Sequence, residues 1–303
     1  IPATVKFVDI AGLVKGAAKG LGLGNQFLAH IREVSAIVEV IRLFKNPQVA
    51  HPETHIDPLR DLEIIGTELI LADLETISRV FTRLESDLKK NDKTIQKKFE
   101  LIKLCEKTLQ SGQWLTTLAL DFEEENLIQP YNFLTRKPVI LVLNIDSEIN
   151  QTELEGIKQQ ILKEAGFPLE EKDILAIDLA NELILSELSE KETKELEVSR
   201  LPFANTLDDL IKRGYQKLDL ITFFTIASKK ETRAWPLKNG STAWEAAGLV
   251  HSDFQEKFIK VEVAFWEDFV KMGSWQNLKE KGKLKIEGRD YLVRDGDILL
   301  FKI

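Results

Sequence analysis

The alternation of apolar and polar positions predicts three buried strands separated by helices. Residues 5–10, 36–43 and 138–143 have the apolar, β-branched content of strands buried in a parallel sheet. Apolar residues at helical spacing occur in residues 26–34 and 154–165. Because strands and helices alternate along the chain, we expect an α/β fold with a parallel sheet.

A stretch with a different composition and apolar pattern lies between the second and third of these strands. It is highly charged, and its apolar residues step by threes and fours, apart from one eight-residue gap and a polar break at Asn91 and Asp92. These apolar positions are Leu62, Ile65, Leu69, Ala72, Val80, Leu84, Leu88, Phe99, Ile102, Cys105 and Leu109. We predict an antiparallel helical hairpin, whose charges either keep two long helices soluble or form a binding surface.

The apolar pattern changes again after a charged stretch at residues 188–200 and a predicted helix at residues 205–218. Short strands are predicted at 221–226, 258–264, 291–293 and 298–301, with turns at 238–241 and 294–297 and a short helix at 242–248. Together these elements predict a compact α+β domain at the end of the chain.

Length and composition limit the classes of protein that fit. With 303 residues, 44% hydrophobic and 30% charged, the chain is expected to form two or three soluble domains. It has no run of ~18 to 20 apolar residues and no basic leader before an apolar run, so we expect a cytoplasmic protein without a membrane partner. The net charge of -8 argues against wrapping DNA or RNA with the whole surface, although a local basic patch remains open. The single cysteine, Cys105, excludes an internal disulfide and is expected in a helix core.

The motif Asp9-Ile10-Ala11-Gly12 follows the first predicted strand. In P-loop hydrolases an aspartate at a strand end helps to hold Mg²⁺, and a nearby glycine amide contacts the terminal phosphate. Gly12 would then be the hinge between two loop states, because glycine changes its backbone angles at little cost. An ordinary strand-to-loop turn would explain these four residues alone, but the motif continues to Gly24 as DIAGLVKGAAKGLGLG.

A dinucleotide-binding fold also places glycines after a strand, but the spacing excludes it. That fold requires G-x-G-x-x-G at the start of a helix, with an acidic residue about 20 positions later. Gly20, Gly22 and Gly24 give only G-x-G-x-G, and they lie well beyond the end of the strand. We therefore do not expect a dehydrogenase.

Longer stretches resemble the YchF group of Obg-related nucleotide hydrolases. The first is DIAGLVKGAAKGLGLGNQFLAHIRE from Asp9, and the others are DLEIIGTELILADLETISR from Asp61 and RGYQKLDLITFFT from Arg213. The stretches RAWPLKNGSTAWEAAGLVHSDFQEKFIKVEV and GRDYLVRDGDILLF resemble a TGS module, which has a β-grasp fold. The resemblance covers essentially all 303 residues.

This resemblance implies an α/β P-loop NTPase core of the Obg type without its N-terminal strand and P-loop. The core would occupy residues 1–52 and 129–204, a helical coiled-coil insertion residues 53–128, a connecting helix residues 205–219 and a TGS domain residues 220–303. The implied function is that of a ribosome-associated, Mg²⁺-dependent ATPase or GTPase that forms the diphosphate and phosphate. Asp9 would support the metal, and Ile10, Ala11 and Gly12 would lie beside the nucleotide.

The resemblance also implies which residues act on the attacking water. The family is similar to small GTPases, but a hydrophobic residue, here Leu13, replaces their water-orienting glutamine. A histidine on the loop after the second strand takes part of that role in the family, and His51 matches it. An imidazole can orient water or exchange a proton near neutral pH, although a lone loop histidine can also be an exposed bystander. Phe44 matches a family residue near the nucleotide, and burial of an aromatic ring is a sufficient alternative explanation.

Base recognition is assigned to the end of the third predicted strand. GTPases use N-K-x-D, whereas the YchF group resembles N-x-x-E and prefers ATP. Asn144 and Ile145 match the start of this motif, but Ser147 stands at the acidic fourth position, between Asp146 and Glu148. The preference for ATP over GTP is therefore only implied by the resemblance.

The P-loop motif G-x-x-x-x-G-K followed by Ser or Thr does not occur in the 303 residues. The family carries that motif on a strand and helix upstream of the position of Ile1, so we expect that such a segment precedes this chain. Without the amide cradle and the phosphate lysine, several charge-assisted contacts of ~1.5 to 3 kcal/mol each are lost. We expect these 303 residues alone to bind Mg-ATP weakly or not at all.

For the TGS-like domain the resemblance implies contact with the ribosome, including ribosomal RNA. Lys229, Lys230, Arg233 and Lys238 could form a small cationic patch beside tryptophans. Ordinary surface lysines around core tryptophans explain the same residues. Two other functions remain open: a GTP-specific translational GTPase, and a nucleotide-independent adaptor that binds the ribosome or RNA.

Overall fold

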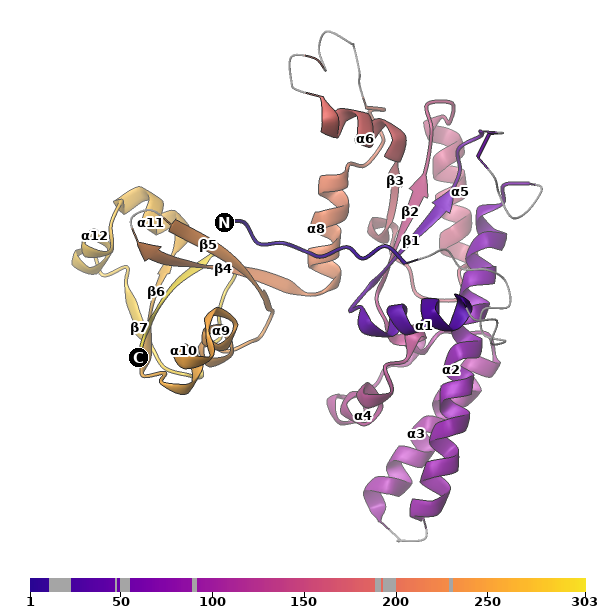
Figure 1. The fold of residues 1–303 in the computed structure, drawn as a ribbon, viewed down its shortest axis with the longest axis horizontal. Coiled ribbons are helices and arrows are strands. Elements are labelled where there is room, and N and C mark those ends of the chain that lie inside the picture. Colours follow the sequence, from indigo (N-terminus) through magenta and orange to yellow (C-terminus); the bar gives the residue numbers. More distant parts are fainter. Residues whose placement is uncertain are drawn as a thin grey trace. The chain divides into compact units, whose positions relative to one another are not determined.

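The computed structural model describes residues 1–10, 23–46, 48–49, 55–88, 92–188, 192, 200–228 and 231–303. The chain divides into two compact units. The first unit is Val8–Arg213, and the second combines Ile1–Phe7 with Gly214–Ile303. Each unit has its own sheet (Figure 1). Each also has its own hydrophobic core.

The first unit contains a three-stranded parallel sheet in the order β1-β2-β3. The strands are β1 (Ile37–Arg42), β2 (Val139–Asn144) and β3 (Ile174–Ile177). The predicted strands at 36–43 and 138–143 are thereby confirmed. Every residue of β2 except the last is buried, as expected for a central strand covered on both faces.

Helices cover both faces of this sheet. Leu141 and Leu143 of β2 share a cluster with residues of α1 (Leu23–Glu33), α2 (Pro58–Leu88) and α5 (Gln151–Glu164). On the other face, Ile140 and Val142 pack with Leu210 of α8 (Leu207–Lys217). This alternation follows from the two-residue repeat of a strand.

Two long helices, α2 and α3 (Lys93–Gln110), follow β1 in the chain and lie side by side (Figure 1). Asp92 caps α3, because its carboxylate accepts a hydrogen bond from the Thr94 amide. The core between the helices contains Ile77, Ile102 and Cys105, each 0% exposed. Cys105 is thus the expected core residue, and burial raises its thiol pKa to about 11.

The remaining helices of the first unit, in the part of the chain that the structure describes, are short. They are α4 (Phe122–Ile128), α6 (Leu179–Glu187) and the 3-10 turns η2 (Leu115–Thr117), η3 (Gln129–Tyr131), η4 (Leu134–Arg136) and η5 (Glu171–Asp173). Within the parts of the chain that the structure describes, no helix combines the length and the apolar character needed to cross a lipid bilayer.

The second unit contains a mixed five-stranded sheet in the order β5-β4-β8-β6-β7. Its strands are β4 (Leu220–Ser228), β5 (Glu231–Lys238), β6 (Lys260–Phe265), β7 (Lys285–Glu287) and β8 (Asp297–Lys302). Its helices are α9 (Ala243–Val250), α10 (Ser252–Glu256), α11 (Trp266–Met272) and α12 (Trp275–Glu280). Phe223, Val261 and Ala247 are fully buried members of its core.

The predicted strand at residues 5–10 is wrong. These residues have no regular secondary structure, and Phe7 and Val8 are about half exposed. An apolar run becomes a strand only where a neighbouring strand pairs with its backbone groups, and β1 is paired here with β2. At the start of the chain, the Ile1 carbonyl instead accepts a hydrogen bond from the Ala234 amide of β5, at 2.9 Å.

The predicted strand at residues 291–293 is also wrong. Only Leu292 forms an isolated bridge, with Thr242, while the Tyr291 hydroxyl donates to Asp297 Oδ2 at 2.8 Å. The predicted turn at 294–297 is confirmed, because the Asp297 amide donates to the Arg294 carbonyl. Gly296 has a φ of +85° there, a conformation that favours glycine.

Candidate functional site

The carboxyl ends of β1 and β2 meet at one edge of the parallel sheet, and Asn144 joins them. Its carbonyl accepts hydrogen bonds from the amides of Leu43 and Phe44, at 2.8 and 3.2 Å. Its side-chain Oδ1 accepts a longer one, 3.4 Å, from the amide of Leu179, the first residue of α6. Asn144 therefore links the loop after β1, the end of β2 and the start of α6.

Asp146 ties together the loops that follow the two strands. Its Oδ2 accepts a hydrogen bond from the Lys45 amide at 2.9 Å, and its Oδ1 accepts one from the Glu148 amide at 3.0 Å. Ser147 and Glu148 are exposed. Both oxygens of the Asp146 carboxylate therefore already hold backbone donors.

Arg42 organises the loop after β1, and sequence reasoning missed it. Its Nε donates to the Phe44 carbonyl at 3.1 Å, its Nη2 to the Asn46 carbonyl at 2.8 Å and its Nη1 to the Val49 carbonyl at 2.9 Å. The guanidinium also lies 4.4 Å from the centre of the Phe44 ring. An arginine at the end of a strand, followed by an aromatic residue two positions on, was the available signal. We refer to Arg42, Phe44, Asn144 and Asp146 as the carboxyl-edge cluster.

The third strand adds a helix N-terminus to the same edge. The Ile145 amide donates to the Ile177 carbonyl at 3.0 Å, and Ile145 itself is buried. Asp178 follows β3 and caps α6, because its Oδ1 accepts a hydrogen bond from the Asn181 amide at 2.9 Å. The buried Ile145 side chain acts in packing, so any contact it makes at the edge comes from its backbone.

Glu39 places a carboxyl group inside the hydrophobic layer beneath this edge. It is 6% exposed and pairs in register with Leu141, on the face of β1 that carries Ile37 and Ile41. No described residue forms a hydrogen bond with its Oε1. Burial raises the pKa of Glu39 to about 8.

The residues expected on the phosphate side are only partly described. Asp9 is exposed, and Ile10 packs against the core of the first unit. The other candidates lie outside the described residues: Ala11, Gly12, Leu13 and His51. The structure therefore brings together Phe44, Asn144 and Ile145, the candidates near the base, but does not describe their relation to the catalytic candidates.

The expected metal ligand, Asp9, lies in the described part of the chain. Of the residues that the structure describes, no three or more histidine, cysteine, aspartate or glutamate side chains are grouped to hold a metal ion. Asp9 is the one expected Mg²⁺ ligand in that part of the chain. A single carboxylate does not make a magnesium site, which needs several oxygen ligands, so the described residues do not fit one by themselves.

The structure separates two members of the expected cationic patch. The Arg233 guanidinium lies 4.0 Å from the centre of the Trp235 ring, whose Nε1 donates to Thr225 Oγ1. Lys238 lies five residues further along β5, on the opposite face, and pairs with Asp219 at 3.3 Å. Lys229 and Lys230 lie outside the described residues.

Comparison with known proteins finds relatives over the whole chain. The protein-family model "YchF-GTPase_C: Protein of unknown function (DUF933)" matches residues 220–303. The chain is 38% identical over 304 residues to the "Ribosome-binding ATPase YchF" of Haemophilus influenzae, covering 100% of this chain and 82% of that protein. It is 37% identical over 305 residues to the protein of the same name from Bacillus subtilis, again covering 100% of this chain and 82% of the relative.

A solved structure supports the same relationship. The YchF GTPase of Schizosaccharomyces pombe is 30% identical and superimposes with a TM-score of 0.77, covering 96% of this chain and 78% of that one. Identity and fold therefore agree over both units of the chain.

Proposed function

Since this chain belongs to the YchF family, we propose that it acts as a ribosome-associated nucleotide hydrolase. The observation that carries the proposal is the carboxyl-edge cluster, in which Asn144 and Asp146 fix two loops beside Phe44. In open α/β sheets, ligands bind outside the carboxyl ends of the strands. We assign the base of the nucleotide to this edge, with Phe44, Asn144 and the Ile145 backbone as its neighbours.

The proposed reaction is hydrolysis of a nucleoside triphosphate to the diphosphate and phosphate. A water oxygen attacks the γ-phosphorus, the bond to the bridging oxygen breaks, and the water proton passes to a base or to phosphate. His51 is the candidate that positions this water, with the aliphatic Leu13 beside it. Gly12 is the candidate that senses the γ-phosphate, with Ile10 and Ala11 on the same segment.

Magnesium would accompany the triphosphate, as it does generally in P-loop ATPases and GTPases. Asp9 is the residue of this chain that we assign to it. The metal would supply positive charge against the phosphates. We do not assign any further ligand among the described residues.

ATP is the proposed substrate rather than GTP. Guanine is read by an acidic side chain that accepts hydrogen bonds, but here the fourth position of the base motif is Ser147. The neighbouring Asp146 holds a backbone donor on each oxygen, which fixes its carboxylate between the two loops. The two relatives from Haemophilus influenzae and Bacillus subtilis are named ATPases, whereas the solved structure is named a GTPase.

We also propose the finer domain assignment. The sheet with its helices would be a P-loop NTPase core of the Obg type, and α2 with α3 its helical insertion. The unit that contains β4–β8 would be a TGS domain with a β-grasp fold, which we propose as a ribosome contact. Arg233 stacked on Trp235 is the described part of its candidate RNA surface. A ribosomal partner would accordingly make this a protein of the cytoplasm.

Substrate competition on the intact protein tests this function. We expect kcat/KM for phosphate release to be at least tenfold higher with ATP than with GTP. A ratio below one would favour the GTPase alternative. Co-sedimentation with ribosomes should also change between ADP and a non-hydrolysable ATP analogue, whereas binding that ignores nucleotide would make the protein an adaptor.

A further inference from the structure

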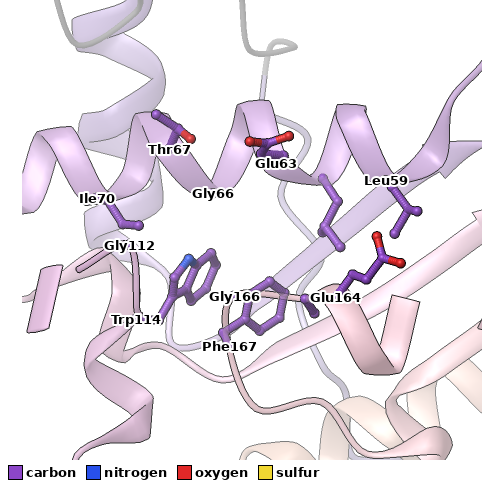
Figure 2. A pocket seen from close by; sticks show the side chains of 12 residues that line it. Leu59, Glu63, Gly66, Thr67, Ile70, Gly112, Trp114, Glu164, Gly166 and Phe167 are labelled. Carbon is purple, nitrogen blue, oxygen red and sulfur yellow. The ribbon is translucent and has the colours of Figure 1, made fainter. Parts of the chain in front are cut away.

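A cavity of about 230 Å³ lies in the first unit beneath α2 (Figure 2). Its walls come from α2, from the segment after α3 and from the end of α5 with the residues that follow it. None of its lining residues belongs to the carboxyl-edge cluster. The nucleotide site proposed above therefore leaves this cavity without a role.

The floor of the cavity carries a buried hydrogen-bond donor. Trp114 is 1% exposed and stacks on Phe167 with ring centres 4.1 Å apart. Its indole nitrogen faces α2 at Gly66, and the place that a Cβ of Gly66 would occupy is 3.4 Å from Nε1 (Figure 2). None of the described residues accepts a hydrogen bond from this N–H. A ligand oxygen placed in the cavity would give this N–H an acceptor.

The rim of the cavity is negatively charged. Glu63 of α2 and Glu164 at the end of α5 both line it, and both are exposed (Figure 2). The Glu164 carboxylate accepts one weak hydrogen bond, from Gln160 Nε2 at 3.5 Å. Among the described residues, none that lines the cavity is a lysine, arginine or histidine. The electrostatic complement of this rim is a cation.

We propose that this cavity binds the side chain of an arginine residue in an extended segment of a partner protein. A planar guanidinium has five donors and pairs with carboxylates such as those of Glu63 and Glu164 more specifically than the point charge of a lysine does. A carbonyl oxygen of the same segment accepts the hydrogen bond from Trp114 Nε1. Free arginine fits less well, because its own carboxylate adds a negative charge beside two others.

The test uses N-acetyl-arginine amide as a probe and the indole N–H resonance of Trp114 as the reporter. The resonance is assigned in ¹⁵N-labelled protein by its loss in Trp114→Phe. We expect saturable shifts with this probe and at least tenfold weaker binding of N-acetyl-citrulline amide, which has the same shape without the charge. Free arginine and N-acetyl-lysine amide should bind more weakly than N-acetyl-arginine amide and more tightly than N-acetyl-citrulline amide. No shift, or equal shifts with the charged and uncharged probes, would overturn the proposal.

Two variants locate the binding and separate it from folding. Gly66→Ala fills the space beside Trp114 Nε1 while improving the helix propensity of α2, so binding should be lost from a protein that is no less stable. Gly156→Ala is the matched control, because a Cβ on that residue of α5 meets nothing within 4 Å, and it should bind the probe as the parent does. Replacing Glu63 and Glu164 together by glutamine should weaken binding at least tenfold. Unchanged binding in Gly66→Ala or in the double glutamine variant would refute the site.

Discussion

At the scale of single residues, the polar side chains of the carboxyl-edge cluster form hydrogen bonds with backbone groups of the neighbouring loops. They therefore fix the positions of these loops. Asn144 and Asp146 together accept hydrogen bonds from three elements or loops. Arg42 donates to three carbonyls of the loop that leads towards His51. Substitutions here are therefore expected to act on ligand binding through loop position.

Asp146→Ala should lower the free energy of unfolding of the first unit by about 1 kcal/mol, because two backbone amides lose a charged acceptor near the surface. The same change should raise the KM for ATP of the intact protein. Denaturant titration and phosphate-release assays measure the two effects. Glu148→Ala is the control, since it removes an equal charge from the same loop. Equal effects of the two changes would argue against the role of Asp146 in holding the loops.

Glu39 makes stability depend on pH. Its pKa rises from 4.5 to about 8 on folding, so the folded protein binds one proton more than the unfolded chain between these values. This contribution to stability is fully present below pH 4.5 and is lost as the pH rises through 8. Glu39→Gln cannot ionise, so it should match the parent at pH 5 and exceed its unfolding free energy by up to about 4 kcal/mol at pH 8.

Denaturant unfolding at pH 5 and pH 8 measures this difference. Glu100→Gln, an exposed change on α3, should leave the pH dependence as it is in the parent. A parent protein that is as stable at pH 8 as Glu39→Gln would show that the Glu39 carboxyl is not buried as described.

At the scale of elements, Asp73 joins α2 to the segment that leads into β2. This fully buried carboxylate on α2 accepts hydrogen bonds from the amides of Leu134 and Thr135, at 2.9 and 2.8 Å, and from the Thr135 hydroxyl at 2.8 Å. Burial raises the pKa of Asp73, and these donors oppose that shift. The contact fixes η4 just before β2 begins.

Asp73→Ala should destabilise the first unit by about 3 kcal/mol, because two buried amides lose their acceptor at once. Thr135→Val removes only the hydroxyl from this contact and should cost about 1 kcal/mol. Denaturant unfolding of both variants provides the comparison. Equal losses would indicate that the amides of Leu134 and Thr135 find another acceptor.

Long elements with a clear apolar repeat could be predicted from the sequence. Short strands, and strands whose existence depends on a neighbouring strand, could not. The long helices α2 and α3, and the apolar runs of β1 and β2, follow from pattern alone. β3 has four residues, too few for a pattern, and β5 contains Pro236, which a strand tolerates here because β5 is at the edge of its sheet. Residues 5–10 have a strand pattern but no pairing partner, and that depends on the rest of the fold.

In the candidate site, too, residues that belong to a motif could be predicted, whereas contacts that depend on the folded backbone could not. Asn144 and Phe44 were found because they match positions of a motif. The hydrogen bonds of Arg42 and Asp146 to the loops could not be predicted, because they depend on where backbone carbonyls and amides lie in space. The cavity below α2 likewise joins residues more than one hundred positions apart.

At the scale of the whole molecule, the chain consists of two units with separate cores, and the candidate nucleotide site lies within the first. The family model matches the second unit, while the relatives match the chain from end to end. The central claim is therefore local: the base of the nucleotide binds where the loops after β1 and β2 are tied together.

Photo-crosslinking of the intact protein with 8-azido-ATP tests that claim most directly. We predict that the label maps to residues 42–46 or 144–148, that excess ATP prevents it and that excess GTP does so at least tenfold less well. Label that ATP displaces from other positions, with none at these two loops, would contradict the account.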